Sequence, residues 1–247
     1  MRLGPIVRRE GLRDLAALAE RIQAGRSTVL ADEVVEAMTT NETLFFRDMI
    51  PFEDLRTRVL PRLARRRSAD GPIRIWSAAA ASGQEAYSVA MIVAANGAAL
   101  GGARVEIVAT DIAQAPLVRA RRGFYSQFEV ERGLPEDMRS RHFRAEANGW
   151  RISPALRKAV VFRRWNLLSD LRPLGQFDVV LCRNVLIYFD HPTKVRVLEA
   201  IVRQMTTDGV LYLGGAETVV GLTDRLAAVP EVPGTYSRQD ARAPEAA

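Results

Sequence analysis

Cysteine and histidine are scarce in this sequence of 247 residues, and their scarcity excludes several kinds of site. The single cysteine, Cys182, cannot form an internal disulfide and is typical of proteins from a reducing cytoplasm. The two histidines, His142 and His191, are too few to build a Cys/His zinc site with it. We therefore expect a cytoplasmic protein with no bound metal.

Long hydrophobic runs are also missing, so we expect no membrane insertion. No stretch approaches the roughly 20 apolar residues that span a bilayer, and residues 1–10 lack the apolar core of a signal peptide. The net charge of +6 favours an acidic partner, either nucleic acid or an acidic protein surface, although a solvated arginine-rich surface explains it equally well. Because the arginines are dispersed and not interleaved with aromatic residues, we expect no nucleic-acid binding.

Signatures of nucleophilic hydrolysis and of phosphoryl transfer are absent as well. No serine lies in a GxSxG elbow, and no Walker lysine follows a glycine-rich loop. Cys182 ends a predicted buried strand, where we expect it to pack as a small apolar group. Both reaction classes are therefore disfavoured.

Residues 72–90 organise the predicted fold. An apolar run of strand character, Ile73–Trp76, leads into small residues, and helical spacing of apolar side chains begins at Glu85. A strand, a small-residue turn and a helix open the nucleotide-binding α/β units. Only Gly83 remains of a GxGxxG motif, which disfavours a pyrophosphate and favours S-adenosylmethionine, a nucleoside without phosphate. An ordinary tight strand-to-helix connection is the alternative interpretation.

The rest of the pattern predicts a mostly parallel α/β sheet flanked by helices. Helical spacing covers 11–38 and 48–67, with Pro51 in the first turn of the second stretch and Pro61 kinking or ending it. An Asn148-Gly149 turn between two short runs predicts a hairpin. Strands are expected at 105–111, 160–162, 177–182 and 210–213, with final antiparallel strands within 226–237. The predicted division is a helical segment at 1–40, an α/β domain at 41–240 with an antiparallel β insertion at about 124–160, and a disordered tail at 241–247.

Polar residues follow several of the predicted strands, at the edge where an open α/β sheet binds its ligands. The carboxylates and amides of this set suit a positively charged sulfonium cofactor better than they suit ATP. Asp111 is expected to accept hydrogen bonds from ribose hydroxyls, unless it only caps the helix that begins near Ala113. The set consists of Glu85, Asp111, Asn166, Asn184 and Glu217.

The predicted ligand edge contains no obvious general base, which favours an acceptor that needs no deprotonation. A carboxylate is already ionised at neutral pH, so its methylation requires alignment and a positive group that holds it. Arg47, which follows two aromatic residues in a predicted loop, and Tyr188, just beyond the fourth strand, are the predicted holders. Alone, each of these residue types is more often found in a surface or packing role.

Five segments resemble, in the same order, the motifs of CheR-type chemoreceptor methyltransferases. Thr39–Asp48 (TTNETLFFRD) resembles the TxNETxFFRD signature of that family, and Trp76–Ser88 resembles its cofactor loop. The resemblance covers about residues 12–237 and implies a class I S-adenosylmethionine-dependent methyltransferase, with a Rossmann-like, mostly parallel seven-stranded sheet. The other three matching segments are Ala109–Ile112, Asn166–Leu168 and Phe177–Asp190.

The family transfers methyl groups from S-adenosylmethionine to glutamate side chains on the cytoplasmic helical domain of chemoreceptors, leaving S-adenosylhomocysteine. The resemblance therefore implies a protein-glutamate O-methyltransferase of chemotaxis, in which Arg47 and Tyr188 flank the sulfonium and the incoming carboxylate. It also implies a cofactor pocket lined by Asn41, Thr43, Arg47, Ala79, Glu85, Asp111, Asn166, Leu167, Asn184 and Val185.

Two departures from the family pattern concern the partners. The 40 residues before Asn41 are fewer than the usual N-terminal domain of the family, whose basic helix contacts the receptor. Some relatives use the β insertion to hold a C-terminal receptor peptide, and the compact insertion at about 124–160 is the corresponding candidate here. The alternatives are a methyltransferase with another acceptor and a non-catalytic scaffold that binds S-adenosylmethionine.

Overall fold

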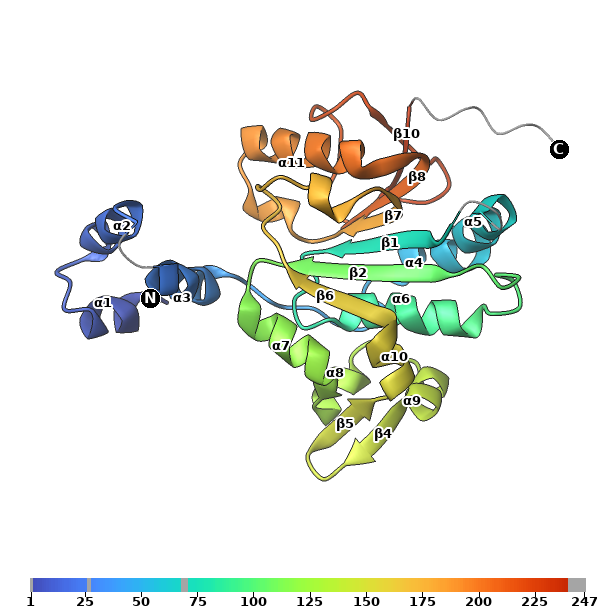
Figure 1. The fold of residues 1–247 in the computed structure, drawn as a ribbon, viewed down its shortest axis with the longest axis horizontal. Coiled ribbons are helices and arrows are strands. Elements are labelled where there is room, and N and C mark those ends of the chain that lie inside the picture. Colours follow the sequence, from blue (N-terminus) through green and yellow to red (C-terminus); the bar gives the residue numbers. More distant parts are fainter. Residues whose placement is uncertain (1, 26–27, 68–70, 240–247) are drawn as a thin grey trace.

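A seven-stranded sheet forms the centre of the computed structural model, which describes residues 2–25, 28–67 and 71–239 (Figure 1). In spatial order its strands are β6 (Val160–Arg164), β2 (Val105–Asp111), β1 (Ile73–Ala78), β7 (Phe177–Cys182), β8 (Met205–Leu213), β10 (Thr235–Arg238) and β9 (Leu226–Ala228). The first five run parallel, whereas β10 pairs antiparallel with both β8 and β9. The predicted mostly parallel α/β sheet, with antiparallel strands at its C-terminal edge, is confirmed.

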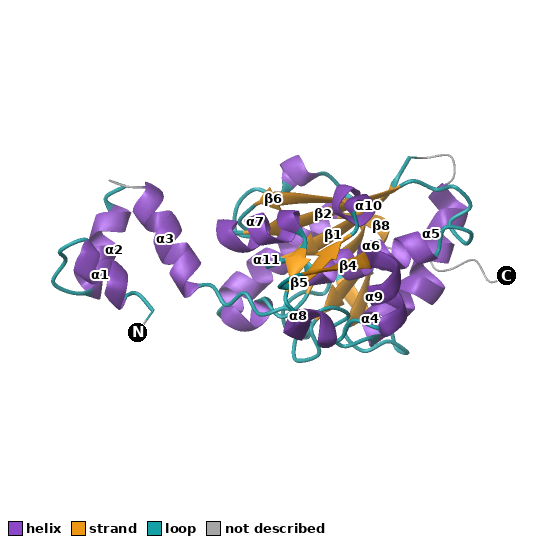
Figure 2. Ribbon diagram, turned by 90° about the horizontal axis from the view of Figure 1, so that it is seen from below, coloured by secondary structure: helices purple, strands orange, loops and turns teal. Residues whose placement is uncertain are grey.

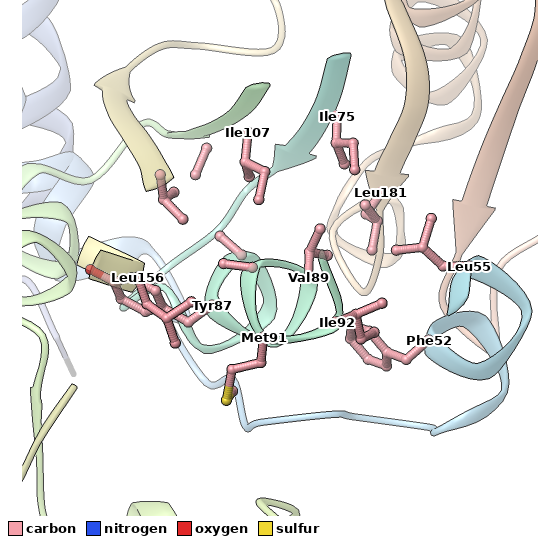
Figure 3. Packing of buried hydrophobic residues seen from close by; sticks show 14 of the residues in the cluster. Phe52, Leu55, Ile75, Tyr87, Val89, Met91, Ile92, Ile107, Leu156 and Leu181 are labelled. Carbon is pink, nitrogen blue, oxygen red and sulfur yellow. The ribbon is translucent and has the colours of Figure 1, made fainter. Parts of the chain in front are cut away.

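Helices cover both faces of this sheet. On one face lie α6 (Gln84–Ala95) and α7 (Gln114–Arg122), and Figure 3 shows the side chains of α6 packed against those of the strands. On the other face lies α11 (His191–Gln204). Consecutive strand residues point to opposite faces, so Ile75 packs in the α6 layer and Trp76 in the α11 layer, both fully buried. Burial on both faces is why the parallel strands are nearly continuous apolar runs.

The N-terminal residues form a small helical cluster that lies beside the α/β body (Figure 2). It contains α1 (Gly4–Arg9), α2 (Leu15–Gln23) and α3 (Thr28–Met38), which share a small apolar core of their own. The helical stretch predicted over 11–38 is therefore two helices, because Gly25, with a left-handed φ of 65°, follows the end of α2. Helix α1, which precedes that stretch, was not predicted.

The helical stretch predicted at 48–67 begins at α4 (Ile50–Asp54) and continues through a π-helical turn (Leu55–Val59) into α5 (Leu60–Arg67). Pro51 lies in the first turn of α4, as predicted. The expectation that Pro61 could end the helix is wrong. Proline has no N–H and its ring crowds the carbonyl one turn earlier, and the wider π turn just before Pro61 accommodates both effects.

The β insertion is confirmed as a small antiparallel sheet of order β3-β5-β4, formed by β3 (Phe124–Tyr125), β4 (Phe143–Glu146) and β5 (Gly149–Ile152). The predicted hairpin joins β4 to β5, although Gly149 already pairs with Glu146, which places the tight loop one residue earlier than expected. The helices around this sheet are α8 (Gln127–Glu131), α9 (Glu136–His142) and α10 (Pro154–Ala159). The tail predicted at 241–247 lies outside the described residues.

Cys182 is fully buried in the α11 layer, where burial raises the pKa of its thiol well above the ordinary value. Its predicted packing role is confirmed. No helix among the described residues is long and apolar enough to cross a membrane.

Candidate active site

A cavity of about 520 Å³ opens where β1, β2, β6 and β7 end. This is the edge at which open α/β sheets bind their ligands, and the volume is that of a small-molecule site. Residues far apart in the sequence meet there, so the fold brings the predicted site residues other than Glu217 together, while their individual roles remain predictions. The predicted residues that line the cavity are Asn41, Thr43, Arg47, Ala79, Glu85, Asp111, Asn166, Leu167, Asn184, Val185 and Tyr188.

Backbone strain is concentrated at this cavity. Among the described residues, the non-glycine residues with a left-handed φ are Phe46, Asp48, Ala79, Ala81 and Asn184. The last three line the cavity, and the first two flank Arg47. Such conformations cost roughly 1–3 kcal/mol each and persist where the surrounding structure fixes them, which is common at functional sites.

The turn between β1 and α6 needs small residues for a steric reason. Gly83 has a φ of 92°, and a Cβ atom there would lie 2.8 Å from the Cβ of Ala120 and 3.1 Å from the Phe162 ring. The Ala80 N–H donates to the Thr110 carbonyl over 2.8 Å, which ties the turn to the end of β2. The turn is therefore a closely packed wall of the cavity.

Asp111 bridges two loops at the end of β2. Its Oδ2 accepts from the Ala81 N–H over 2.8 Å and its Oδ1 from the Ala113 N–H over 2.9 Å. The first N–H groups of α7 are instead capped by Glu36 of α3, which accepts from Gln114 and from Ala115. Asp111 is therefore more than a helix cap, and because each carboxylate oxygen accepts more than one hydrogen bond, it can still take ligand hydroxyls.

Two kinds of polar side chain meet in the cavity, some fully engaged and others free. The buried Glu85 accepts from the Ser77 hydroxyl over 2.8 Å and from Nη1 of Arg183 over 3.1 Å. Within the described part of the chain, the half-buried Arg47 guanidinium and the exposed Tyr188 hydroxyl form no hydrogen bond or ion pair. A free cation and a free phenol beside one cavity can bind an anionic group together.

The loop after β7 is held from behind by Glu217. This carboxylate accepts from the N–H groups of Asn184 (2.8 Å), Leu186 (2.7 Å), Ile187 (3.3 Å) and Gly214 (2.7 Å). Glu217 does not line the cavity, so its placement in the set of ligand-edge residues was wrong. Its role in the structure is to fix the loop that carries Asn184 and Tyr188.

The cavity also contains residues that the sequence interpretation missed. Trp165 and Arg183 directly follow β6 and β7, so a strict use of the strand-end rule includes them. Val35 and Met38 of α3 had no such signal, because their pattern predicts only the apolar face of a helix. Helix α3 thus supplies one wall. The described residues contain no group of three or more His, Cys, Asp or Glu side chains that could hold a metal.

Residues 41–233 match the family model of the CheR methyltransferase SAM-binding domain. The chain belongs to the CheR family. It is 40% identical over 237 residues to the chemotaxis protein methyltransferase Cher2 of Pseudomonas putida, with 94% of this chain and 86% of the relative covered. It is 42% identical over 241 residues to chemotaxis protein methyltransferase 1 of Pseudomonas aeruginosa, with 96% and 87% covered. This CheR-family chain is therefore an S-adenosylmethionine-dependent methyltransferase of chemotaxis, as the resemblance implied.

The lining of the cavity fits the cofactor of the CheR family. When bound, S-adenosylmethionine supplies an electrophilic methyl group on a positively charged sulfonium. Glu85 and Asp111 provide negative charge, Asn166 and Asn184 provide neutral donors and acceptors, and the turn at Gly83 lacks the further glycines of a pyrophosphate site. The cavity is thus suited to a cationic nucleoside without phosphate.

We expect cofactor affinity to fall in mild acid because of Asp111. Burial raises the pKa of this carboxyl above its ordinary value, so it takes up a proton at a higher pH than an exposed aspartate does. Protonation removes the charge to which ribose hydroxyls are predicted to donate, and affinity for S-adenosylhomocysteine should therefore weaken as the pH falls from about 8 to about 5. Calorimetry across this range tests the expectation. Asp111→Asn should bind weakly at every pH without the same fall, and equal slopes for both proteins would contradict the prediction.

Proposed function

We propose that this CheR-family enzyme methylates glutamate carboxylates of chemoreceptor cytoplasmic helical domains, and that it acts in the cytoplasm. The observation that supports this acceptor is that the Arg47 guanidinium and the Tyr188 hydroxyl both line the cavity and are both free. No histidine or lysine lines the cavity among the described residues, and its carboxylates, Glu42, Glu85 and Asp111, already accept hydrogen bonds, which favours an acceptor that needs no deprotonation.

Cofactor binding is assigned in this proposal to the residues that line the floor of the cavity. Asp111 accepts from the ribose hydroxyls, Glu85 faces the cationic end, and Asn166 and Asn184 satisfy polar edges. The remaining contacts are made by Asn41, Thr43, Arg47, Ala79, Leu167 and Val185.

Arg47 and Tyr188 hold the acceptor in this proposal. A glutamate carboxylate is ionised at neutral pH, so it needs no base before it attacks. The Arg47 fork can bind one or both of its oxygens, and the Tyr188 hydroxyl can donate a further hydrogen bond. Together they align the attacking oxygen, and alignment of this kind accounts for a large share of such catalysis.

Two features support a chemoreceptor as the partner. The relatives are named chemotaxis protein methyltransferases, and the net charge of +6 is suited to an acidic surface. We further propose that the β insertion binds a receptor C-terminal peptide. Its β4 lies at the edge of the three-stranded sheet with mostly exposed residues, and an open edge can accept an added strand.

The test is methyl transfer from labelled S-adenosylmethionine to a purified cytoplasmic receptor fragment. We expect label on the fragment that is released as methanol by mild alkali, because methyl esters hydrolyse readily. A fragment whose acceptor glutamates are replaced by alanine should take up none. Alkali-stable label would indicate another acceptor, and cofactor binding without any transfer would indicate a scaffold.

A further inference from the structure

Arg183 directly follows β7 and connects two sides of the cavity. Only 2% of its side chain is exposed. Its Nη1 donates to Glu85 over 3.1 Å, and its Nη2 donates to the Asp48 carboxylate over 2.8 Å and to the Arg47 carbonyl over 2.7 Å. Its Cζ lies 5.5 Å from the centre of the Phe52 ring. One buried guanidinium thus joins the first turn of α6 to the loop that carries Arg47.

The loop around Arg47 needs this support. Phe46 and Asp48 have φ angles of 50° and 56°, so the backbone on both sides of Arg47 is in the left-handed region. Apart from the contacts with Arg183, the Phe46 N–H is tied to the Ser88 hydroxyl over 3.0 Å. A strained segment keeps its shape only where such contacts fix it. The position of Arg47 therefore depends on where Arg183 lies.

Arg183 and its two carboxylate partners, Glu85 and Asp48, form a charged cluster that is suited to a cationic cofactor. Glu85 and Asp48 carry two negative charges and Arg183 one positive charge, so the group has a net charge of −1 beside a cavity that takes a cationic cofactor. A buried carboxylate is costly unless it is paired, and Arg183 supplies the pairing for Glu85. Arg183 is not available as the acceptor-binding cation, because its side chain is only 2% exposed, three of its five N–H donors are engaged and its Nε–H is buried.

We propose that Arg183 is a positioning residue that couples the cofactor side of the cavity, through Glu85, to the placement of the Arg47 loop. This inference rests on the proposed function only for the role of Arg47, whereas the contact with Glu85 concerns cofactor binding alone. Binding of the cofactor next to Glu85 thereby fixes the position of Arg47 on the acceptor side, through the side chain of Arg183.

Three variants separate the two halves of this link, which are the contact of Arg183 with Glu85 and its contacts with the loop around Arg47. Arg183→Met removes both halves, and we expect it to weaken S-adenosylhomocysteine binding at least about 10-fold and to lower kcat about 100-fold. Arg183→Lys keeps the charge without the fork, so it should retain more affinity than kcat. Asp48→Asn weakens only the loop half, because it removes the carboxylate charge and leaves at most a neutral hydrogen bond to Arg183. This side chain is more than half exposed, so the variant should fold normally. It should keep the affinity within about twofold and lower kcat about 10-fold.

Arg58→Lys is the matched control, since Arg58 also pairs with a buried carboxylate, Asp54, but lies away from the cavity. It should change neither affinity nor kcat. The coupling is overturned if Asp48→Asn leaves kcat unchanged, or if Arg183→Met binds S-adenosylhomocysteine as tightly as the natural protein. The binding arm needs no acceptor, so it decides the cofactor-side role of Arg183 even if no receptor fragment is methylated and the proposed function fails.

Discussion

Arg47→Met is expected to lower kcat for receptor methylation by roughly 100- to 1,000-fold, the loss that follows removal of one preorganised charge-stabilising donor from an active site. The half-buried guanidinium has no partner among the described residues, although the nearby carboxylates of Asp48 and Glu85 are both paired with Arg183. A cation kept free in this way is available to the acceptor. Steady-state kinetics with a receptor fragment, together with calorimetry on S-adenosylhomocysteine, measures the effect.

The split between binding and turnover tests this role of Arg47. Because the guanidinium is assigned chiefly to the acceptor, the affinity for S-adenosylhomocysteine should fall far less than kcat does. Arg47→Lys keeps the charge but loses the fork, so its kcat should lie between those of Arg47→Met and the natural protein. Arg163→Met, an exposed arginine of β6 outside the cavity, is the control and should match the natural protein. A kcat within about threefold for Arg47→Met would remove Arg47 from the mechanism.

Much of this architecture could be predicted because it is encoded locally. The strand Phe177–Cys182 is buried on both faces and is apolar throughout except for one aspartate, so its pattern identifies it directly. Parallel strands end at one edge of the sheet, and this rule alone places Asp111, Asn166 and Asn184 near one another. Chemistry then explains the preference for this cofactor, since the turn at Gly83 lacks the further glycines that are typical of a pyrophosphate site.

The features that could not be predicted depend on contacts between distant segments. Helix α3 reaches the cavity because Asp32 pairs with Arg164 and Glu36 caps α7, and no periodicity specifies either contact. Glu217 follows β8 as a ligand-edge residue does, yet its side chain turns to the backbone of a neighbouring loop. In the sequence, a carboxylate that faces a ligand and one that faces backbone N–H groups are the same residue type at the same strand-end position. Only the folded chain shows which carboxylates face a ligand and which face N–H groups.

Glu217→Gln is expected to lower the free energy of unfolding by about 3 kcal/mol and to reduce kcat strongly. Each carboxylate oxygen accepts from two backbone N–H groups, Oε1 from Leu186 and Ile187 and Oε2 from Asn184 and Gly214. In either orientation the amide NH₂ of glutamine faces two of these donors and can satisfy neither. A buried donor left unsatisfied costs about 1–3 kcal/mol. Urea unfolding measures the loss, and methyl-transfer kinetics measures its effect on the loop of Asn184 and Tyr188.

Glu199→Gln is the matched comparison, because within the described part of the chain Glu199 of α11 accepts only from side chains, the Thr223 hydroxyl over 2.6 Å and Arg225 over 3.3 Å. An amide can keep the first of these bonds, and the second is a partly exposed ion pair, so the change in stability should stay below about 1 kcal/mol. If Glu217→Gln destabilises the chain while kcat is unchanged, the loop after β7 holds its shape without Glu217. The position of Tyr188 would then be set by the strand end alone, and the carboxylate would serve stability and not the alignment of the acceptor.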